Sequence, residues 1–132
     1  MSVSRYYGKK ARRLSVDGET FMWRVKHRHT VSTGQYRGCI EILELRRFRA
    51  PGRLTLIFAP GPGRDVGGYP GASGVIFLNG AGCLNLHEPG TTRAFLDDAL
   101  ASGWDPGSPA QEERDGWPMF EKVAARRSAA RR

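Results

Sequence analysis

LSVDGETFMWRV, residues 14–25, holds the clearest folding signal in this sequence. Apolar residues alternate with polar ones on both sides of the dipeptide Asp17-Gly18, namely Leu14, Val16, Phe21, Trp23 and Val25. An Asp-Gly pair between two alternating segments is typical of a two-residue β-hairpin turn, because both turn residues adopt positive φ angles. The stretch therefore predicts the first hairpin of an antiparallel sheet.

Four further segments have the composition of strands and are bounded by turn residues: residues 39–45, 53–59, 74–79 and 83–87. Pro51 and Gly52 supply the turn between the first two segments, with Gly52 expected at positive φ, so these segments are predicted to pair as a hairpin. The apolar pattern changes phase between Ile42 and Leu43, which allows either a β-bulge or a strand covered on both faces.

Three stretches are predicted to be loops. Residues 28–37 are polar and contain glycine, residues 60–74 are dominated by glycine and proline, and residues 105–115 combine turn residues with an acidic run. Such compositions neither nucleate a helix nor favour a continuous ladder of strand pairing.

One segment has the periodicity of an amphipathic helix. Pro89 suits the first helical position, and a buried face recurs with a 3.6-residue period at Thr92, Phe95, Leu96, Ala99 and Leu100. Gly103 is expected to end the helix in a left-handed conformation, with Trp104 folded back onto Ala99. Residues 116–123 are predicted to form a short last strand, followed by a tail with weak helical tendency.

These elements predict an α+β fold, in which an antiparallel sheet of about six or seven strands carries one amphipathic helix on one face. The helix is expected to cover the face that carries Trp23, Leu56, Phe77 and Leu84. The other face of the sheet stays partly open. Residues 13–123 form the single predicted domain, between a flexible basic arm of residues 1–12 and a basic C-terminal tail of residues 124–132.

Charge is the most unusual bulk property of the chain. The sequence has 21 Lys and Arg residues against 13 Asp and Glu residues, which gives a net charge of +8. Seventeen of the basic residues are arginines, whose planar guanidinium groups suit phosphate, although a GC-rich genome produces the same composition without any function. A chain this basic attracts polyanions at low salt.

The cellular compartment is inferred from the N-terminus and the cysteines. Residues 1–13 are charged but are followed by no apolar run, so we expect neither a secretory signal nor a membrane partner. Cys39 and Cys83 lie in apolar segments and are expected to be buried thiols, with a cross-strand disulfide as the alternative. The expected location is the cytoplasm.

A family resemblance follows the expected helix and the first hairpin. The residues that carry it are Glu88-Pro89, Arg93, Phe95, Ala99, Leu100, Gly103-Trp104-Asp105-Pro106, Val16-Asp17-Gly18 and Trp23-Arg24-Val25. In these features the chain resembles small uncharacterised α+β proteins that are common in actinobacteria. The resemblance covers about half of the chain and rests on residues that determine the fold, so it implies an architecture without an assigned function.

Catalytic and metal-binding patterns are weak in this sequence. His27 and His29 are two residues apart, so both would lie on one side of a strand, and His87 ends another strand, but no further ligand lies close to them in sequence. Ser73 lacks the spacing of a nucleophile elbow, and no carboxylate pair is placed for acid–base chemistry. We therefore expect a protein that is not an enzyme, with no cofactor and no metal.

The glycine-rich stretch 58–68 is a weak candidate for phosphate binding. Gly61, Gly63 and Gly67 miss the dinucleotide-binding spacing by one residue, and no Lys-Ser or Lys-Thr pair follows them. Binding of phosphate or a small molecule at this loop is a second alternative for the function.

Nucleic-acid binding has better support from the sequence. The candidate residues are Tyr6, Tyr7, Lys9, Lys10, Arg12 and Arg13 in the N-terminal arm, and Arg46, Arg47, Arg49 and Arg53 at the predicted hairpin. Basic side chains bind phosphates, and bases stack on tyrosine rings. No helix-turn-helix, zinc-finger, RRM or KH signature is present, so binding is expected to be weakly specific and strongly salt-dependent.

A protein-interaction subunit of a larger assembly is the first alternative. The acidic second half of the chain suits a basic partner, and residues 117–120, WPMF, provide an apolar anchor. The same four residues are equally expected in the core. We therefore predict a binding or accessory protein, with nucleic acid as the first expected partner and a protein as the second.

Overall fold

The structure is a computed structural model that describes residues 11–32, 35–66 and 74–130. These residues form eight strands and two α-helices, so the predicted α+β class is confirmed. The strands are β1 Arg12–Val16, β2 Glu19–Ser32, β3 Gln35–Arg47, β4 Arg53–Phe58, β5 Arg64–Val66, β6 Val75–Leu78, β7 Gly82–Asn85 and β8 Gln111–Asp115. The helices are α1 Pro89–Ala101, the short 3-10 helix η1 Trp117–Met119, and α2 Phe120–Ala130.

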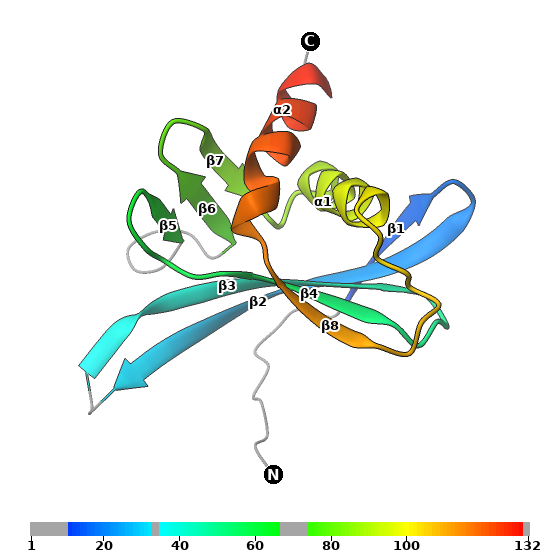
Figure 1. Cartoon of the computed structure of the whole chain (residues 1–132), viewed down its shortest axis with the longest axis horizontal. Coiled ribbons are helices and arrows are strands. Elements are labelled where there is room, and N and C mark those ends of the chain that lie inside the picture. Colours follow the sequence, from blue (N-terminus) through cyan, green and yellow to red (C-terminus); the bar gives the residue numbers. More distant parts are fainter. Residues whose placement is uncertain (1–10, 33–34, 67–73, 131–132) are drawn as a thin grey trace.

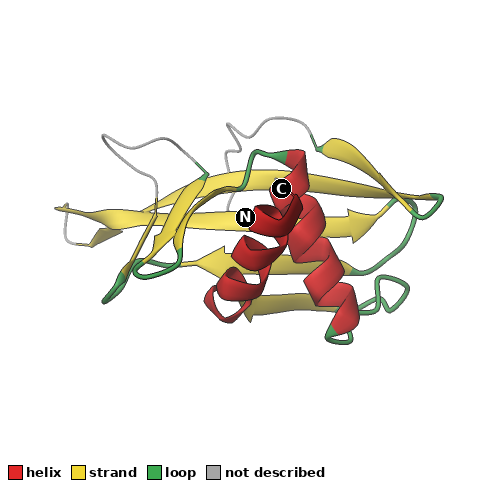
Figure 2. Cartoon of the chain, turned by 90° about the horizontal axis from the view of Figure 1, so that it is seen from above, coloured by secondary structure: helices red, strands yellow, loops and turns green. Residues whose placement is uncertain are grey.

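The strands form two sheets. A five-stranded sheet has the order β1-β2-β3-β4-β8, and a three-stranded antiparallel sheet has the order β5-β6-β7. Strands β1 to β4 pair antiparallel, whereas β8 lies parallel to β4. Both helices and the small sheet lie on one side of the five-stranded sheet (Figures 1 and 2), and no described helix or strand covers its other face.

Two local predictions are confirmed by backbone geometry. Asp17 and Gly18 have φ angles of 51° and 80° between β1 and β2, as the hairpin turn requires. Gly103 has a φ of 103° after α1, and the backbone N–H of Trp104 donates to Ala99 O over 3.0 Å.

No helix of the described residues has the length and hydrophobicity needed to cross a membrane.

The hydrophobic core lies between the five-stranded sheet and the two helices. Trp23, Leu56 and Leu84 belong to it as expected, but Phe77 is 39% exposed. Phe77 pairs with Cys83, and both side chains are exposed, whereas the neighbouring pair Ile76 and Leu84 is buried. The expectation that Phe77 and Cys83 are buried is wrong. In β6 and β7 the alternate residues Ile76 and Leu84 pack into the core, so Phe77 and Cys83 point away from it.

The C-terminal prediction of a strand at residues 116–123 is also wrong. Trp117, Phe120 and Val123 are buried and lie three residues apart, which is the spacing of one helical face. Pro118 stands in the first turn, where a missing backbone N–H costs nothing. The segment therefore forms η1 and α2, and α2 packs against α1 (Figure 2).

Strand pairing extends into the three predicted loops. The expected loop 28–37 is largely the paired ends of β2 and β3, which continue beyond β4 as a two-stranded ribbon with a register shift at Thr30 and Val31. β5 lies within residues 60–74, and β8 lies within 105–115. Cross-strand hydrogen bonds with a neighbouring segment stabilise these polar stretches in spite of their composition.

The predicted hairpin of residues 39–45 and 53–59 is present as β3 and β4. Ile42 and Leu43 are 3% and 0% exposed, and no register shift separates them, so the strand has no β-bulge here and both side chains are buried although they point to opposite faces. In the connecting turn the positive φ belongs to Arg49, at 65°, and not to Gly52.

Gly52 is needed for a close backbone approach. A Cβ at this position would lie 2.5 Å from Ser108 O and 2.7 Å from Pro106 O, and the Gly52 N–H donates to Pro106 O over 3.1 Å. The turn before β4 thus packs directly on the segment that leads into β8. The glycine, predicted for its conformational freedom, acts here through its small size.

Gly52→Ala is expected to lower the free energy of unfolding by about 1–2 kcal/mol, because two backbone carbonyls cannot yield as a flexible side chain would. Urea denaturation measures this loss. Gly61→Ala is the matched control, since its Cβ would meet only Arg64 side-chain atoms at 3.6 Å or more. Equal stabilities of the two variants would contradict the close-approach explanation.

Candidate nucleic-acid interface

Six basic residues of β1 to β4 lie on the face of the five-stranded sheet opposite the helices. Alternation along the strands places them there, because their chain neighbours Leu14, Trp23, Leu45 and Leu54 point into the core or pack against it. The strand register aligns Arg13 with Met22 and Met22 with Arg46, in one row across three strands. We call this surface the cationic face: Arg13, Arg24, Lys26, Arg28, Arg46 and Arg53.

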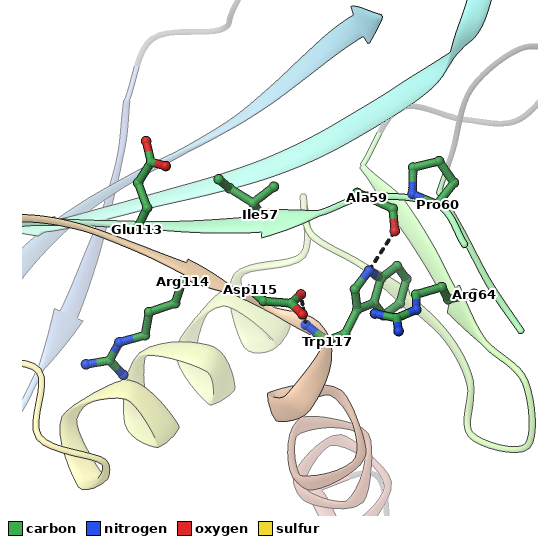
Figure 3. Close-up of a pocket in the computed structure, with 8 residues that line it drawn as sticks. All are labelled: Ile57, Ala59, Pro60, Arg64, Glu113, Arg114, Asp115 and Trp117. Carbon is green, nitrogen blue, oxygen red and sulfur yellow. Dashed lines mark hydrogen bonds between the residues drawn. The ribbon is translucent and has the colours of Figure 1, made fainter. Parts of the chain in front are cut away.

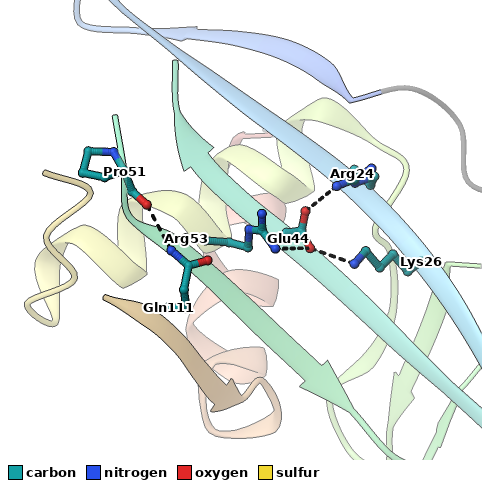
Figure 4. A network of polar contacts seen from close by, with 6 residues as sticks. All are labelled: Arg24, Lys26, Glu44, Pro51, Arg53 and Gln111. Carbon is teal, nitrogen blue, oxygen red and sulfur yellow. Dashed lines mark hydrogen bonds and ion pairs between the residues drawn. The ribbon is translucent and has the colours of Figure 1, made fainter. Parts of the chain in front are cut away.

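Glu44 lies at the centre of the cationic face (Figure 4). Its carboxylate is 2.8 Å from Arg24 Nη2, 2.8 Å from Lys26 Nζ and 3.9 Å from Arg53 Nη1. Burial alone would raise its pKa, but hydrogen bonds and charge from Lys26 and Arg24 outweigh burial and lower the pKa of Glu44. One carboxylate thus holds three cations close to the sheet surface.

The charge of this face is strongly unbalanced. Among the described residues of β1 to β4 that point to it, six are basic and only Glu44 is acidic. The parallel register adds Glu113 beside Thr55 and Asp115 beside Ile57, at the β8 edge. The face is therefore basic over β1, β2 and β3 and acidic along its β8 edge.

The structure separates the residues that the sequence grouped together. Arg13, Arg46 and Arg53 lie on the cationic face, but Arg12 points to the core side, where its guanidinium is 4.5 Å from the Trp23 ring centroid and donates to His87 O over 2.8 Å. The prediction that Arg12 is a nucleic-acid contact is not supported by these contacts.

The predicted basic residues at the turn between β3 and β4 do not share one surface either. Arg47 points to the helix side, with Nη1 3.7 Å from Glu19 Oε1, and Arg49 lies over the Phe48 ring at 5.1 Å from its centroid. Tyr6, Tyr7, Lys9 and Lys10 are outside the described residues.

Arg24, Lys26 and Arg28 were not predicted as site residues. The signal was present in the sequence, because basic residues occupy every second position from Arg24 to Arg28 between residues of the core side. A search for basic residues that are adjacent in the sequence misses this pattern, because on a strand only alternate residues share a face.

A pocket of about 420 Å³ lies between the ends of β4 and β8 and the start of η1 (Figure 3). Most of its polar side chains have protein partners. Trp117 Nε1 donates to Ala59 O over 2.8 Å, the Trp117 N–H donates to Asp115 Oδ1 over 3.1 Å, and Arg64 lies 5.6 Å from the indole. Arg114 bonds Glu112 and Ser102. These contacts connect β8 to its surroundings and leave little for a ligand.

His27 and Glu41 form a pair on the core side of β2 and β3. Glu41 is fully buried, and burial raises its pKa, although hydrogen bonds from His27 and the Gly74 backbone act in the opposite direction. His87 packs against Gly74. The His29 side chain lies outside the described set, and no group of three metal-ligating side chains occurs among the residues that the structure describes.

The glycine-rich loop does not have the geometry of a phosphate cradle in its described part. Gly61 and Gly63 lead into the strand β5, and Gly61 pairs with Arg64 in an isolated bridge. A phosphate-binding loop leads into a helix N-terminus instead. The alternative function at this loop therefore gains no support.

No protein-family model, curated protein or solved structure matches this chain. The resemblance to small actinobacterial proteins stays a prediction.

Proposed function

We propose that this chain is a non-enzymatic binding protein that contacts nucleic acid through the cationic face. The observation that supports the proposal is the gathering of six basic side chains from four adjacent strands on one face, where a single carboxylate, Glu44, holds three of them. Nucleic acid is a polyanion with regularly spaced charges, and arginine and lysine are its ordinary protein ligands.

The spacing of the charges suits a phosphate backbone. Arg24, Lys26 and Arg28 alternate along β2, so the Cα atoms of successive basic residues are about 6.8 Å apart along the strand. This separation is comparable to that of successive phosphates in an extended nucleic-acid strand. Arg13 and Arg46 flank Met22 and widen the basic surface across the sheet.

The proposed binding has little sequence preference. Contacts to phosphates position a protein but carry no sequence information, and base reading in a duplex needs an element that enters a groove. The cationic face is built from side chains of sheet strands alone. Its binding should therefore depend steeply on salt, because each phosphate contact releases counterions.

The double substitution Arg28→Glu and Arg46→Glu is expected to weaken nucleic-acid binding about 10- to 100-fold at low salt. The slope of log K against log salt concentration should become shallower by the equivalent of about one or two phosphate contacts. Both side chains are exposed, so folding should be preserved. Fluorescence anisotropy with labelled oligonucleotides across a salt series measures both quantities.

Lys122→Glu with Arg126→Glu is the matched control. These two residues are exposed on α2, on the helix side of the sheet, and their reversal changes the net charge equally. The proposal predicts that the control binds nearly as well as the unmodified protein. Absence of binding by the unmodified chain at about 50 mM salt, or an equal loss in both double variants, would refute it.

A further inference from the structure

We infer that the nucleic acid bound by the cationic face is single-stranded, with one base stacked against Phe48. The inference rests on the proposed function and specifies its ligand. It is carried by the position of an exposed aromatic ring at the end of the row of basic residues, together with a surface from which no described helix projects.

Phe48 is 46% exposed, one of two large hydrophobic side chains among the described residues that are clearly exposed. Phe48 is the first turn residue after β3, and its N–H donates to Thr20 O over 2.8 Å, so one backbone hydrogen bond continues beyond the last strand pair, Arg47 with Phe21. Alternation then places Phe48 on the same face as Arg46. An apolar ring thus adjoins the basic residues.

Arg49 adds a second planar group at this place. Its guanidinium carbon lies 5.1 Å from the Phe48 ring centroid, in the range of a cation–π contact. Unpaired bases stack on aromatic rings and on guanidinium planes, and a base of any type has the required π-face. Bases inside a duplex are already stacked on each other and cannot use such a platform.

The form of the surface also favours a single strand. The β2–β3 ribbon extends beyond the other strands of the sheet (Figures 1 and 2), and no described helix projects from the cationic face toward a duplex groove. A flexible strand can follow the charges of β2 and reach Phe48 at the turn. A rigid duplex would meet only part of this row at once.

The test compares oligothymidine and oligouridine of about twelve nucleotides with a duplex of the same length, at one fixed salt concentration. We expect either single strand to bind about ten-fold more tightly than the duplex. Phe48→Ala should weaken single-strand binding about five- to ten-fold and leave duplex binding unchanged. If oligothymidine binds more tightly than oligouridine, the preferred ligand is single-stranded DNA, and if oligouridine binds more tightly, it is single-stranded RNA. Either result supports the inference.

Phe77→Ala is the matched control, because Phe77 is the other exposed phenylalanine, at 39%, and lies on β6 of the small sheet. It should bind like the unmodified protein. Equal or tighter binding of the duplex, or equal affinities of the two alanine variants, would overturn the single-strand inference while the proposed function stands. Binding of neither form would instead reject the proposed function and with it this inference.

Discussion

Phe58→Ala is expected to lower the free energy of unfolding by about 3–5 kcal/mol, the usual cost of removing a fully buried phenylalanine ring. Phe58 is fully buried at the end of β4. Its ring centroid lies 5.5 Å from that of Phe95 on α1 and 5.4 Å from that of Trp117 in η1, both in edge-to-face contact. One side chain therefore joins the sheet to both helical segments, and its removal leaves a cavity where they meet.

Chemical denaturation of the variant, monitored by tryptophan fluorescence, measures this loss. Because small domains have total stabilities of only about 5–15 kcal/mol, Phe58→Leu, expected to cost less, is a second variant in case the alanine variant does not fold. Phe48→Ala, 46% exposed in the β3–β4 turn, is the control and should cost less than about 0.5 kcal/mol. A comparable loss in Phe58→Ala and Phe48→Ala would contradict the central position assigned to Phe58.

The sequence predicted those parts of the fold that depend on local chemistry. Asp17-Gly18 and Gly103 need positive φ angles, and glycine or aspartate at the right offset from an apolar pattern reveals this directly. The segments that it missed depend on distant partners. The five residues of β8, QEERD, have no apolar alternation, and only their parallel pairing with β4 makes them a strand.

The helix at the C-terminus was missed for a different reason. Trp117, Met119 and Phe120 fit both a short strand and the start of a helix, because a run of four residues is too short to distinguish a period of 2 from a period of 3.6. Val123 and the contact of α2 with α1 decide between them. That contact joins two segments that are separate in the sequence, so the local residue pattern does not predict it.

The candidate site could be predicted only in part, since charge clusters in the sequence are divided by strand geometry. Arg46 and Arg47 are adjacent in the chain, but Arg46 points to the cationic face and Arg47 to the helix side near Glu19. Arg24 and Arg46 are distant in the chain and lie on adjacent strands of the same face. Register, which depends on turns and on core packing, determines which cations share a surface.

Glu44→Gln is expected to lower the free energy of unfolding by about 2–3 kcal/mol near neutral pH, because it removes the charge that pairs with Arg24, Lys26 and Arg53. The Glu44 side chain is only 7% exposed, whereas the three cations are 30%, 21% and 42% exposed. Water screens the cations in part, so the loss is smaller than for a fully buried ion pair. Glu113→Gln, exposed at the β8 edge, is the control and should change stability little.

The pH dependence distinguishes this ionic contribution from a packing effect. The pKa of Glu44 is lowered below its ordinary value of 4.5 in the folded state, so its contribution is present above that value and is lost as the pH falls through the lowered folded pKa. Glu41 acts in the opposite sense, because its raised pKa makes protonation favour the folded state at low pH. The stability of Glu44→Gln is therefore compared with that of the unmodified chain at each pH, which cancels the contribution of Glu41. We expect the difference to disappear in acid, and a difference that stays constant with pH would show that Glu44 acts through its shape and not through its charge.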